Sequence, residues 1–145
     1  MFHHILLPTD GSALSETAVR HGLDLARASG ARVTGLHVMP DYHVLTYRVE
    51  SIEDTREEFA RDCREHAARH LARISHAADE MQVPARTLAE VSDHPWETIC
   101  RVAERDGCDL IVMASHGRRG MTGLLLGSET QRVLTHTKIP VMVWR

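Results

Sequence analysis

Apolar positions along this chain follow two patterns that alternate from one end to the other. Short segments rich in apolar residues predict strands at residues 3–9, 32–38, 85–91, 109–114 and 139–144. Between them, apolar residues at spacings of three and four predict helices at residues 12–29, from about 53 to 81, after Pro95 and from Ser128 onward. Strand–helix units in tandem imply an α/β fold, with a parallel sheet, right-handed crossovers and helices on both faces.

Local signals mark several of the helix boundaries. Gly30 ends the first helix, and Ser92 or Asp93 stands as a helix cap before Pro95. Residues 39–52 have no clear period and are expected to form a loop or a short irregular helix. The longest helix carries an apolar stripe for packing on a sheet, formed by Phe59, Cys63, Ala67, Leu71, Ile74, Ala78 and Met81.

Residues 115–127 form a connection far longer than is usual in α/β units, between a strand expected to be buried on both faces and a helix. The glycines at 117, 120, 123 and 127 permit positive φ and a close approach of the backbone to a ligand. Ser128 and Gln131 match a Ser-x-x-Gln capping box, which would direct the first helix amides toward an anion. With Arg118 and Arg119 beside them, these features predict a phosphate-binding loop. A glycine-rich loop that only covers an edge of the domain is the alternative.

Two common phosphate-binding motifs are absent from the sequence. A Walker A loop needs a lysine after its last glycine, whereas the only lysine of the chain is Lys138. No Gly-x-Gly-x-x-Gly follows the first predicted strand, as a dinucleotide-binding fold requires. The chain instead has Ala114-x-x-Gly117, nine further residues, and then Gly127-Ser128. This spacing resembles the nucleotide-binding signature Gly-x-x-Gly-(nine residues)-Gly-Ser/Thr of the universal stress proteins, with Ala114 in place of the first glycine.

The resemblance extends over most of the chain. Residues 5–12 look like the family's opening strand and turn, residues 36–38 like the end of its second strand, and residues 139–143 like its closing strand. The resemblance implies a Rossmann-like, open, doubly wound sheet of five parallel strands in the order 3-2-1-4-5. That order would place strands 1 and 4 side by side and bring Asp10 against the loop that starts at Ala114.

The site implied by this arrangement is a nucleotide-binding crevice. Asp10 would accept hydrogen bonds from ribose hydroxyls or an adenine amine, or would cap the first helix, and both roles are open. Glu129 would repel phosphates unless a bound Mg²⁺ bridges the two groups. No catalytic residue is assigned. His66 and His70, at i and i+4, could bind one edge of a metal ion, but no third ligand is apparent, so no metal ligand is assigned either. The predicted nucleotide-binding residues are Pro8, Thr9, Asp10, Val38, Met113, Ala114, His116, Gly117, Arg118, Gly127, Ser128, Glu129 and Thr130.

Composition and charge narrow the functional classes. The 145 residues, 43% hydrophobic, suit one domain over residues 1–145, and a formal charge of -3 with a pI near 6.4 indicates no nucleic-acid partner. The longest apolar run is too short to span a membrane, and the first residues lack the basic region of a signal peptide, so we expect a cytoplasmic protein. Three widely spaced cysteines indicate neither a disulfide framework nor a structural zinc site.

Three functions remain open at this point. The first is a stress-response regulatory or sensor protein that binds ATP or a related adenine nucleotide, with or without Mg²⁺, and acts on an unknown protein partner. The second is a slow ATP hydrolase, disfavoured because the loop has no lysine and no evident general base besides His116 or Asp10. The third is a dimeric interaction module that binds no nucleotide. The apolar strand Val141–Trp144 at the sheet edge predicts a homodimer, unless Trp144 packs within its own chain.

Overall fold

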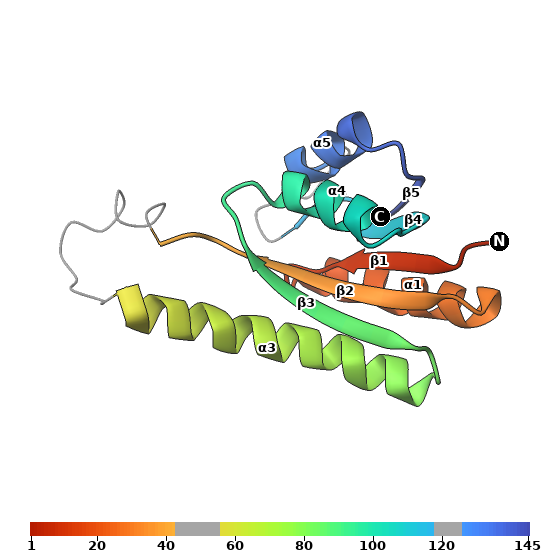
Figure 1. Cartoon of the computed structure of the whole chain (residues 1–145), viewed down its shortest axis with the longest axis horizontal. Coiled ribbons are helices and arrows are strands. Elements are labelled where there is room, and N and C mark those ends of the chain that lie inside the picture. The colour runs from red at the N-terminus through yellow and green to blue at the C-terminus, as the bar shows by residue number, and fades with distance from the viewer. Residues whose placement is uncertain (43–55, 118–125) are drawn as a thin grey trace.

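The computed structural model describes residues 1–42, 56–117 and 126–145. Its five strands are all parallel and lie in the order β3-β2-β1-β4-β5, with helices on both faces (Figure 1). This confirms the expected fold class and strand order. The elements are β1 His4–Pro8, α1 Ala13–Ser29, β2 Arg32–Met39, α3 Arg56–Glu80, β3 Ala85–Val91, α4 Pro95–Arg105, β4 Leu110–Ala114, α5 Ser128–His136 and β5 Val141–Trp144.

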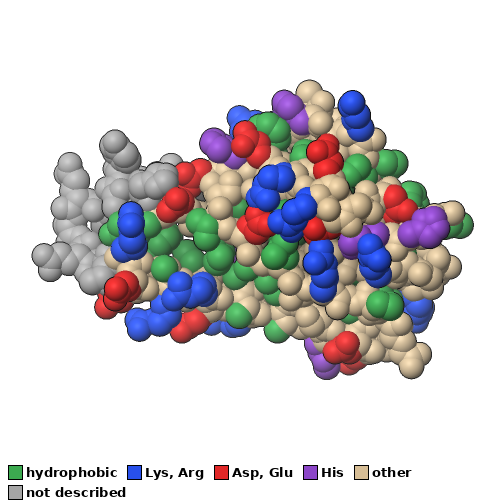
Figure 2. Space-filling view, in the orientation of Figure 1, with side chains coloured by type: hydrophobic (Ala, Val, Ile, Leu, Met, Phe, Trp, Pro, Cys, Tyr) green, Lys and Arg blue, Asp and Glu red, His purple; other side chains and the backbone are tan. Residues whose placement is uncertain are grey.

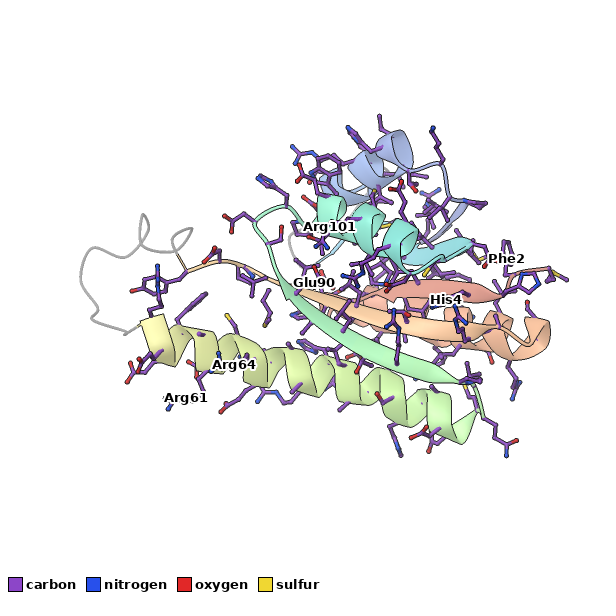
Figure 3. All side chains as sticks on the ribbon, in the orientation of Figure 1. Phe2, His4, Arg61, Arg64, Glu90 and Arg101 are labelled. Atoms are coloured by element: carbon purple, nitrogen blue, oxygen red, sulfur yellow. The ribbon has the colours of Figure 1, made fainter. Side chains whose placement is uncertain are left out.

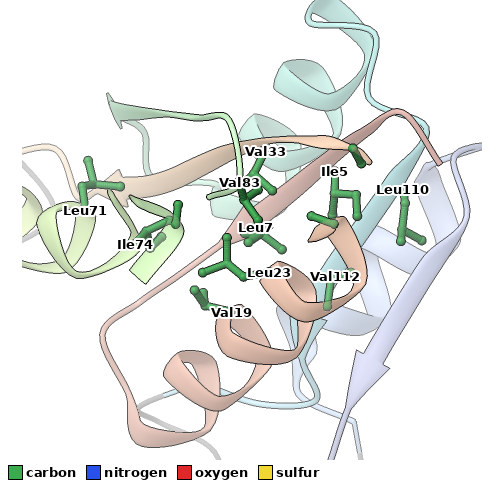
Figure 4. Close-up of a cluster of buried hydrophobic side chains, with 13 residues drawn as sticks. Ile5, Leu7, Val19, Leu23, Val33, Leu71, Ile74, Val83, Leu110 and Val112 are labelled. Atoms are coloured by element: carbon green, nitrogen blue, oxygen red, sulfur yellow. The ribbon is translucent and has the colours of Figure 1, made fainter. Parts of the chain in front are cut away.

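Two apolar cores fill the space between the sheet and the helices, one on each face of the sheet. On one face, Ile5 and Leu7 of β1 pack with Leu23 of α1 and Ile74 of α3 in a fully buried cluster (Figure 4). On the other face, Leu6 packs with residues of α4 and α5. Because successive strand residues point to opposite faces, every residue of the central strands β1 and β4 is buried. These two strands therefore form a rigid base for the loops at their carboxyl ends.

The α3 stripe is confirmed where it meets the core. Ala67, Leu71, Ile74 and Ala78 are buried against the sheet, whereas Cys63 at the first turns is half-buried. The predicted start of this helix, residues 53–55, lies outside the described residues, as does most of the segment 39–52. No helix in the described part of the chain is long and apolar enough to cross a membrane.

Helix α4 begins differently from the prediction. Its N-cap is His94, whose side chain makes no capping hydrogen bond, and Pro95 is the first helical residue. Ser92 Oγ instead accepts a hydrogen bond from His94 N at 3.1 Å, and Asp93 Oδ1 accepts one from Asp41 N at 3.1 Å. Ser92 is therefore used by the turn before the helix, and Asp93 binds the backbone just after β2.

Candidate functional site

A cleft of about 700 Å³ opens at the carboxyl edge of the sheet. It lies where β1 and β4 are neighbours and where the connections from these two strands run to opposite faces. Its walls come from the ends of β1, β2 and β4, from the middle of α3, and from the starts of α4 and α5. Segments remote in sequence thus meet at one place.

The predicted nucleotide-binding residues converge on this cleft. Arg118 lies outside the described residues, together with Arg119, Gly120 and Gly123. The other predicted residues all line the cleft, and they are Pro8, Thr9, Asp10, Val38, Met113, Ala114, His116, Gly117, Gly127, Ser128, Glu129 and Thr130.

Asp10 lies against the start of the glycine-rich loop, as the strand order implied. Its Oδ1 accepts a hydrogen bond from Ser12 N at 2.9 Å, and its Oδ2 lies where a Cβ on Gly117 would be. The N-cap of α1 is Ser12, which accepts from Ser15 N, so the alternative role of Asp10 as the helix cap is wrong. Asp10 instead braces the turn before the cap and turns a carboxylate oxygen toward the loop.

The glycines at the two ends of the loop serve close packing rather than unusual backbone angles. Gly117 and Gly127 both have φ outside the left-handed region, so neither uses the positive φ that glycine permits. A Cβ on Gly127 would lie 3.1 Å from His116 Cα, and a Cβ on Gly117 would overlap the Asp10 carboxylate. Any larger residue would push the loop ends away from their neighbours.

Backbone hydrogen bonds anchor both loop ends to the sheet. Ser115 N donates to Trp144 O at 2.7 Å, and Gly127 N donates to Ser115 O at 2.7 Å. Thr130 Oγ1, which is buried, donates to Ala114 O at 2.9 Å. The first turn of α5 is therefore held against the end of β4, with the helix N-terminus at the cleft.

The predicted capping box of α5 is wrong. The N-cap is Gly127, with an extended backbone, and no side chain caps the helix. Ser128 already has helical backbone and cannot act as the cap, and the Gln131 amide donates to Leu126 O at 2.9 Å. The N-terminal amides of α5 are consequently not covered by a capping side chain.

Glu129 has a structural partner that sequence reasoning missed. Its Oε2 accepts a hydrogen bond from Trp96 N at 2.8 Å. Because Pro95 has no N–H and His94 does not cap, Trp96 N is the amide at this end of α4 that needs an acceptor. Glu129 thus joins the N-termini of α4 and α5 across one wall of the cleft.

Three histidines form the opposite wall, and sequence reasoning assigned none of them to the nucleotide site. His37 Nδ1 donates to Thr9 O at 2.8 Å, and the His37 and His70 ring centroids are 5.3 Å apart. His70 also fills the space over Gly11, where a Cβ would overlap its ring. His66 lies next to His70, with ring centroids 6.4 Å apart. Within residues 1–42, 56–117 and 126–145, no cluster of three ligating side chains could hold a metal ion.

Comparison with known proteins agrees with this geometry. The model of the universal stress protein family matches residues 1–145. Universal stress protein MJ0577 of Methanocaldococcus jannaschii is 27% identical over 154 residues, which cover 99% of this chain and 94% of that protein. The solved structure of MJ0577 superposes with a TM-score of 0.84 at 28% identity, over 99% of this chain and 96% of that one.

Two more distant structures share the fold. A universal stress protein solved in complex with cAMP has a TM-score of 0.73 and 21% identity, over 99% of this chain and 97% of that one. A universal stress protein of Archaeoglobus fulgidus in complex with dAMP has a TM-score of 0.66 and 17% identity, over 100% of this chain and 98% of that one. The match to the family model covers the whole chain, residues 1–145. The chain therefore belongs to the universal stress protein family.

Proposed function

We propose that this chain binds an adenine nucleotide, with ATP as the expected ligand, and acts as a regulatory protein in a stress response. The observation that carries the proposal is the convergence of Asp10, Gly117 and Gly127 on one cleft. A carboxylate suited to a ribose and a glycine loop suited to phosphates are thereby adjacent. The universal stress proteins solved with cAMP and dAMP support an adenine nucleotide as the ligand class.

The two ends of the cleft differ in chemistry. At the α5 end, the uncapped helix amides and the Ser128 hydroxyl suit phosphate oxygens, because a helix N-terminus presents N–H groups and a positive dipole end. At the β2 end, Val38 and Pro8 offer apolar walls for a base. Asp10 lies between these ends and is the expected ribose ligand. A nucleotide laid from β2 to α5 matches this order.

Efficient catalysis is not part of the proposal. Phosphoryl transfer relies on a metal, fixed cations and a positioned nucleophile. Glu129, the acid of α5 at the cleft, is already bonded to Trp96 N. Mg²⁺ would therefore bind as a complex with the nucleotide, coordinated mainly by the phosphates of the nucleotide.

We propose further that β5 is the interface of a homodimer. It is the edge strand next to β4, and Met142 on it is 39% exposed. An exposed apolar edge requires cover, which a second β5 would provide. Trp144 stacks on His21 of its own chain, with centroids 3.7 Å apart, so one face of the half-buried indole is already covered. The proposed contact therefore depends on the strand edge and on Met142.

The test is calorimetric titration of ATP, ADP and AMP, with and without Mg²⁺, into nucleotide-free protein. Micromolar ATP binding that is lost in Gly117→Val supports the proposal, because the added side chain overlaps the Asp10 carboxylate. Ala28→Val, exposed near the C-terminal end of α1 and not part of the cleft, is the matched control and should bind as the native chain does. A folded native protein that binds none of the three nucleotides refutes the proposal and leaves the interaction module. Phosphate release from bound ATP identifies the hydrolase.

A further inference from the structure

A polar corner lies at the amino edge of the sheet, at the opposite end of the strands from the cleft. Strand register pairs His4 with Arg32 and Thr34 with Arg86. Residues paired in this way point to the same face, and His4 and Thr34 lie on one face because alternate residues of neighbouring strands do. The face is the one that α4 covers, and Figure 3 labels His4 near the amino end of β1. A shallow cavity of about 510 Å³ beside Asp106, at the end of α4, exposes this corner.

Buried hydrogen bonds hold the floor of the cavity in one arrangement. His4 Nδ1 lies 3.1 Å from Asp106 O and must donate to it, because a carbonyl only accepts. His4 Nε2 is then the acceptor of the Thr34 hydroxyl, 2.8 Å away. Thr34 Oγ1 in turn accepts from Arg86 Nε at 3.1 Å. His4 is 3% exposed and Thr34 is 0% exposed, so the guanidinium of Arg86 is anchored on a rigid polar base.

The arginines at this corner outnumber the carboxylates that pair with them. Asp109, another carboxylate at this edge, accepts hydrogen bonds from His3 N and His4 N. Arg86 Nη2 lies 2.5 Å from Asp106 Oδ2, and Arg105 Nε lies 2.9 Å from Asp106 Oδ1, so two guanidiniums share this one carboxylate. Arg32 is exposed, and in the described part of the chain no carboxylate lies within ion-pair distance of it. Burial, and after it the charge of Arg32, lowers the pKa of His4.

Glu90, the next carboxylate along this face, does not neutralise the corner, because two other arginines already pair with it. Arg101 and Arg105 both pair with Glu90, whose side chain is 18% exposed. In the space-filling view, several basic side chains lie across the middle of this face, with acidic side chains beside and between them (Figure 2). Arg86 keeps 58% of its side chain exposed although its Nε and Nη2 are bonded, so its outer N–H groups face the solvent. A guanidinium of this kind suits a planar or tetrahedral oxyanion.

We propose that the corner between Arg32 and Arg86 binds a small oxyanion, either a phosphate or a carboxylate. Arg86 supplies oriented donors, because Thr34 and Asp106 fix its plane. Arg32 supplies the charge that no carboxylate of the described residues neutralises. The neutral His4 ring forms the floor and keeps the Thr34 hydroxyl turned toward it. The site is separate from the nucleotide cleft and does not depend on the function proposed above.

The test uses the ring resonances of His4, followed by NMR while inorganic phosphate and, separately, succinate are added at constant ionic strength. A saturable shift of the His4 signals with a midpoint in the low-millimolar range supports the proposal. Saturation by phosphate alone identifies the phosphate class, and saturation by succinate alone the carboxylate class. In Arg32→Gln the saturable shift should disappear, whereas Arg132→Gln on α5, with the same loss of charge, should leave it unchanged.

Two results overturn the proposal. One is a His4 shift that grows linearly with both anions in the native chain, since that reports bulk ionic effects only. The other is a saturable shift that persists in Arg32→Gln, since the anion would then bind elsewhere. Because Arg32 is exposed and its side chain has no hydrogen bond within the described residues, its replacement should not disturb folding. Amide spectra of the variant check this directly.

Discussion

Replacing Glu129 separates a structural role from a ligand-binding role. Its carboxylate accepts from Trp96 N at 2.8 Å, so Glu129→Ala removes the acceptor of the α4 N-terminus and a negative charge at its positive dipole end. Loss of such a cap costs about 1 kcal/mol, and loss of the charge adds about 0.3–1 kcal/mol. We expect the free energy of unfolding to fall by about 1–2 kcal/mol in total. Glu129→Gln keeps an oxygen acceptor and should lose only the charge contribution.

The same substitutions should raise the affinity for Mg²⁺-free ATP although they lower stability. A carboxylate about 4 Å from a phosphate in a water-like medium repels it by about 1 kcal/mol. Removing the charge should therefore tighten the binding of Mg²⁺-free ATP by roughly fivefold in both variants. If Mg²⁺ bridges Glu129 to the phosphates, the same variants should instead bind Mg²⁺–ATP more weakly than the native chain.

Urea unfolding and calorimetric ATP titration of the three proteins measure both effects. Native stability in Glu129→Ala would refute the capping role inferred from the Trp96 contact. Equal stability losses in the two variants would show that the charge alone, and not the hydrogen bond, stabilises α4. Unchanged affinities with and without Mg²⁺ would place the phosphates away from Glu129.

Three further changes test the scaffold of the cleft and the amino edge. Thr130→Val should lower the free energy of unfolding by about 1–3 kcal/mol, measured in urea, because the buried Ala114 carbonyl loses its donor; native stability would contradict this. Gly11→Ala should cost about 1–3 kcal/mol, seen as an earlier thermal transition, because φ is 78° and the His70 ring occupies the Cβ position. Burial lowers the pKa of His4 below its unfolded value, so the folded state binds fewer protons and stability should fall as pH drops below about 6.5. Urea midpoints at pH 7.5 and 5.5 should differ more for the native chain than for His4→Gln, and equal differences would contradict the assignment.

Local sequence patterns were sufficient for the helices and strands, but not for their order in the sheet. The predicted strand 85–91 has the observed bounds, and the helix predicted from 12 to 29 begins one residue later, with Ser12 as its cap. Continuous apolar runs and glycine stops act over a few residues, so one sequence reveals them. The strand order came from the family resemblance, because the order in a parallel sheet depends on packing between distant segments.

The site was predictable where a motif is local and not where two distant segments meet. Gly117 and Gly127 were found from their spacing, but their reason is close packing against Asp10 and His116, which only the folded chain brings near. The Glu129 contact joins residues 33 apart in sequence, and no spacing rule covers it. His70 likewise reaches the cleft only because α3 crosses the turn at Gly11.

The backbone bonds at the loop ends couple the edge strand β5 to the cleft. Trp144 O holds Ser115 N, and Ser115 O holds Gly127 N, so two consecutive bonds run from the margin of the sheet to the start of α5. A sliding of β5 along β4 would carry Ser115, and with it the helix amides, away from the cleft. If the proposed nucleotide binds there, any molecule that prefers one position of β5 would alter the affinity for the nucleotide, and the nucleotide would alter the affinity for that molecule by the same factor.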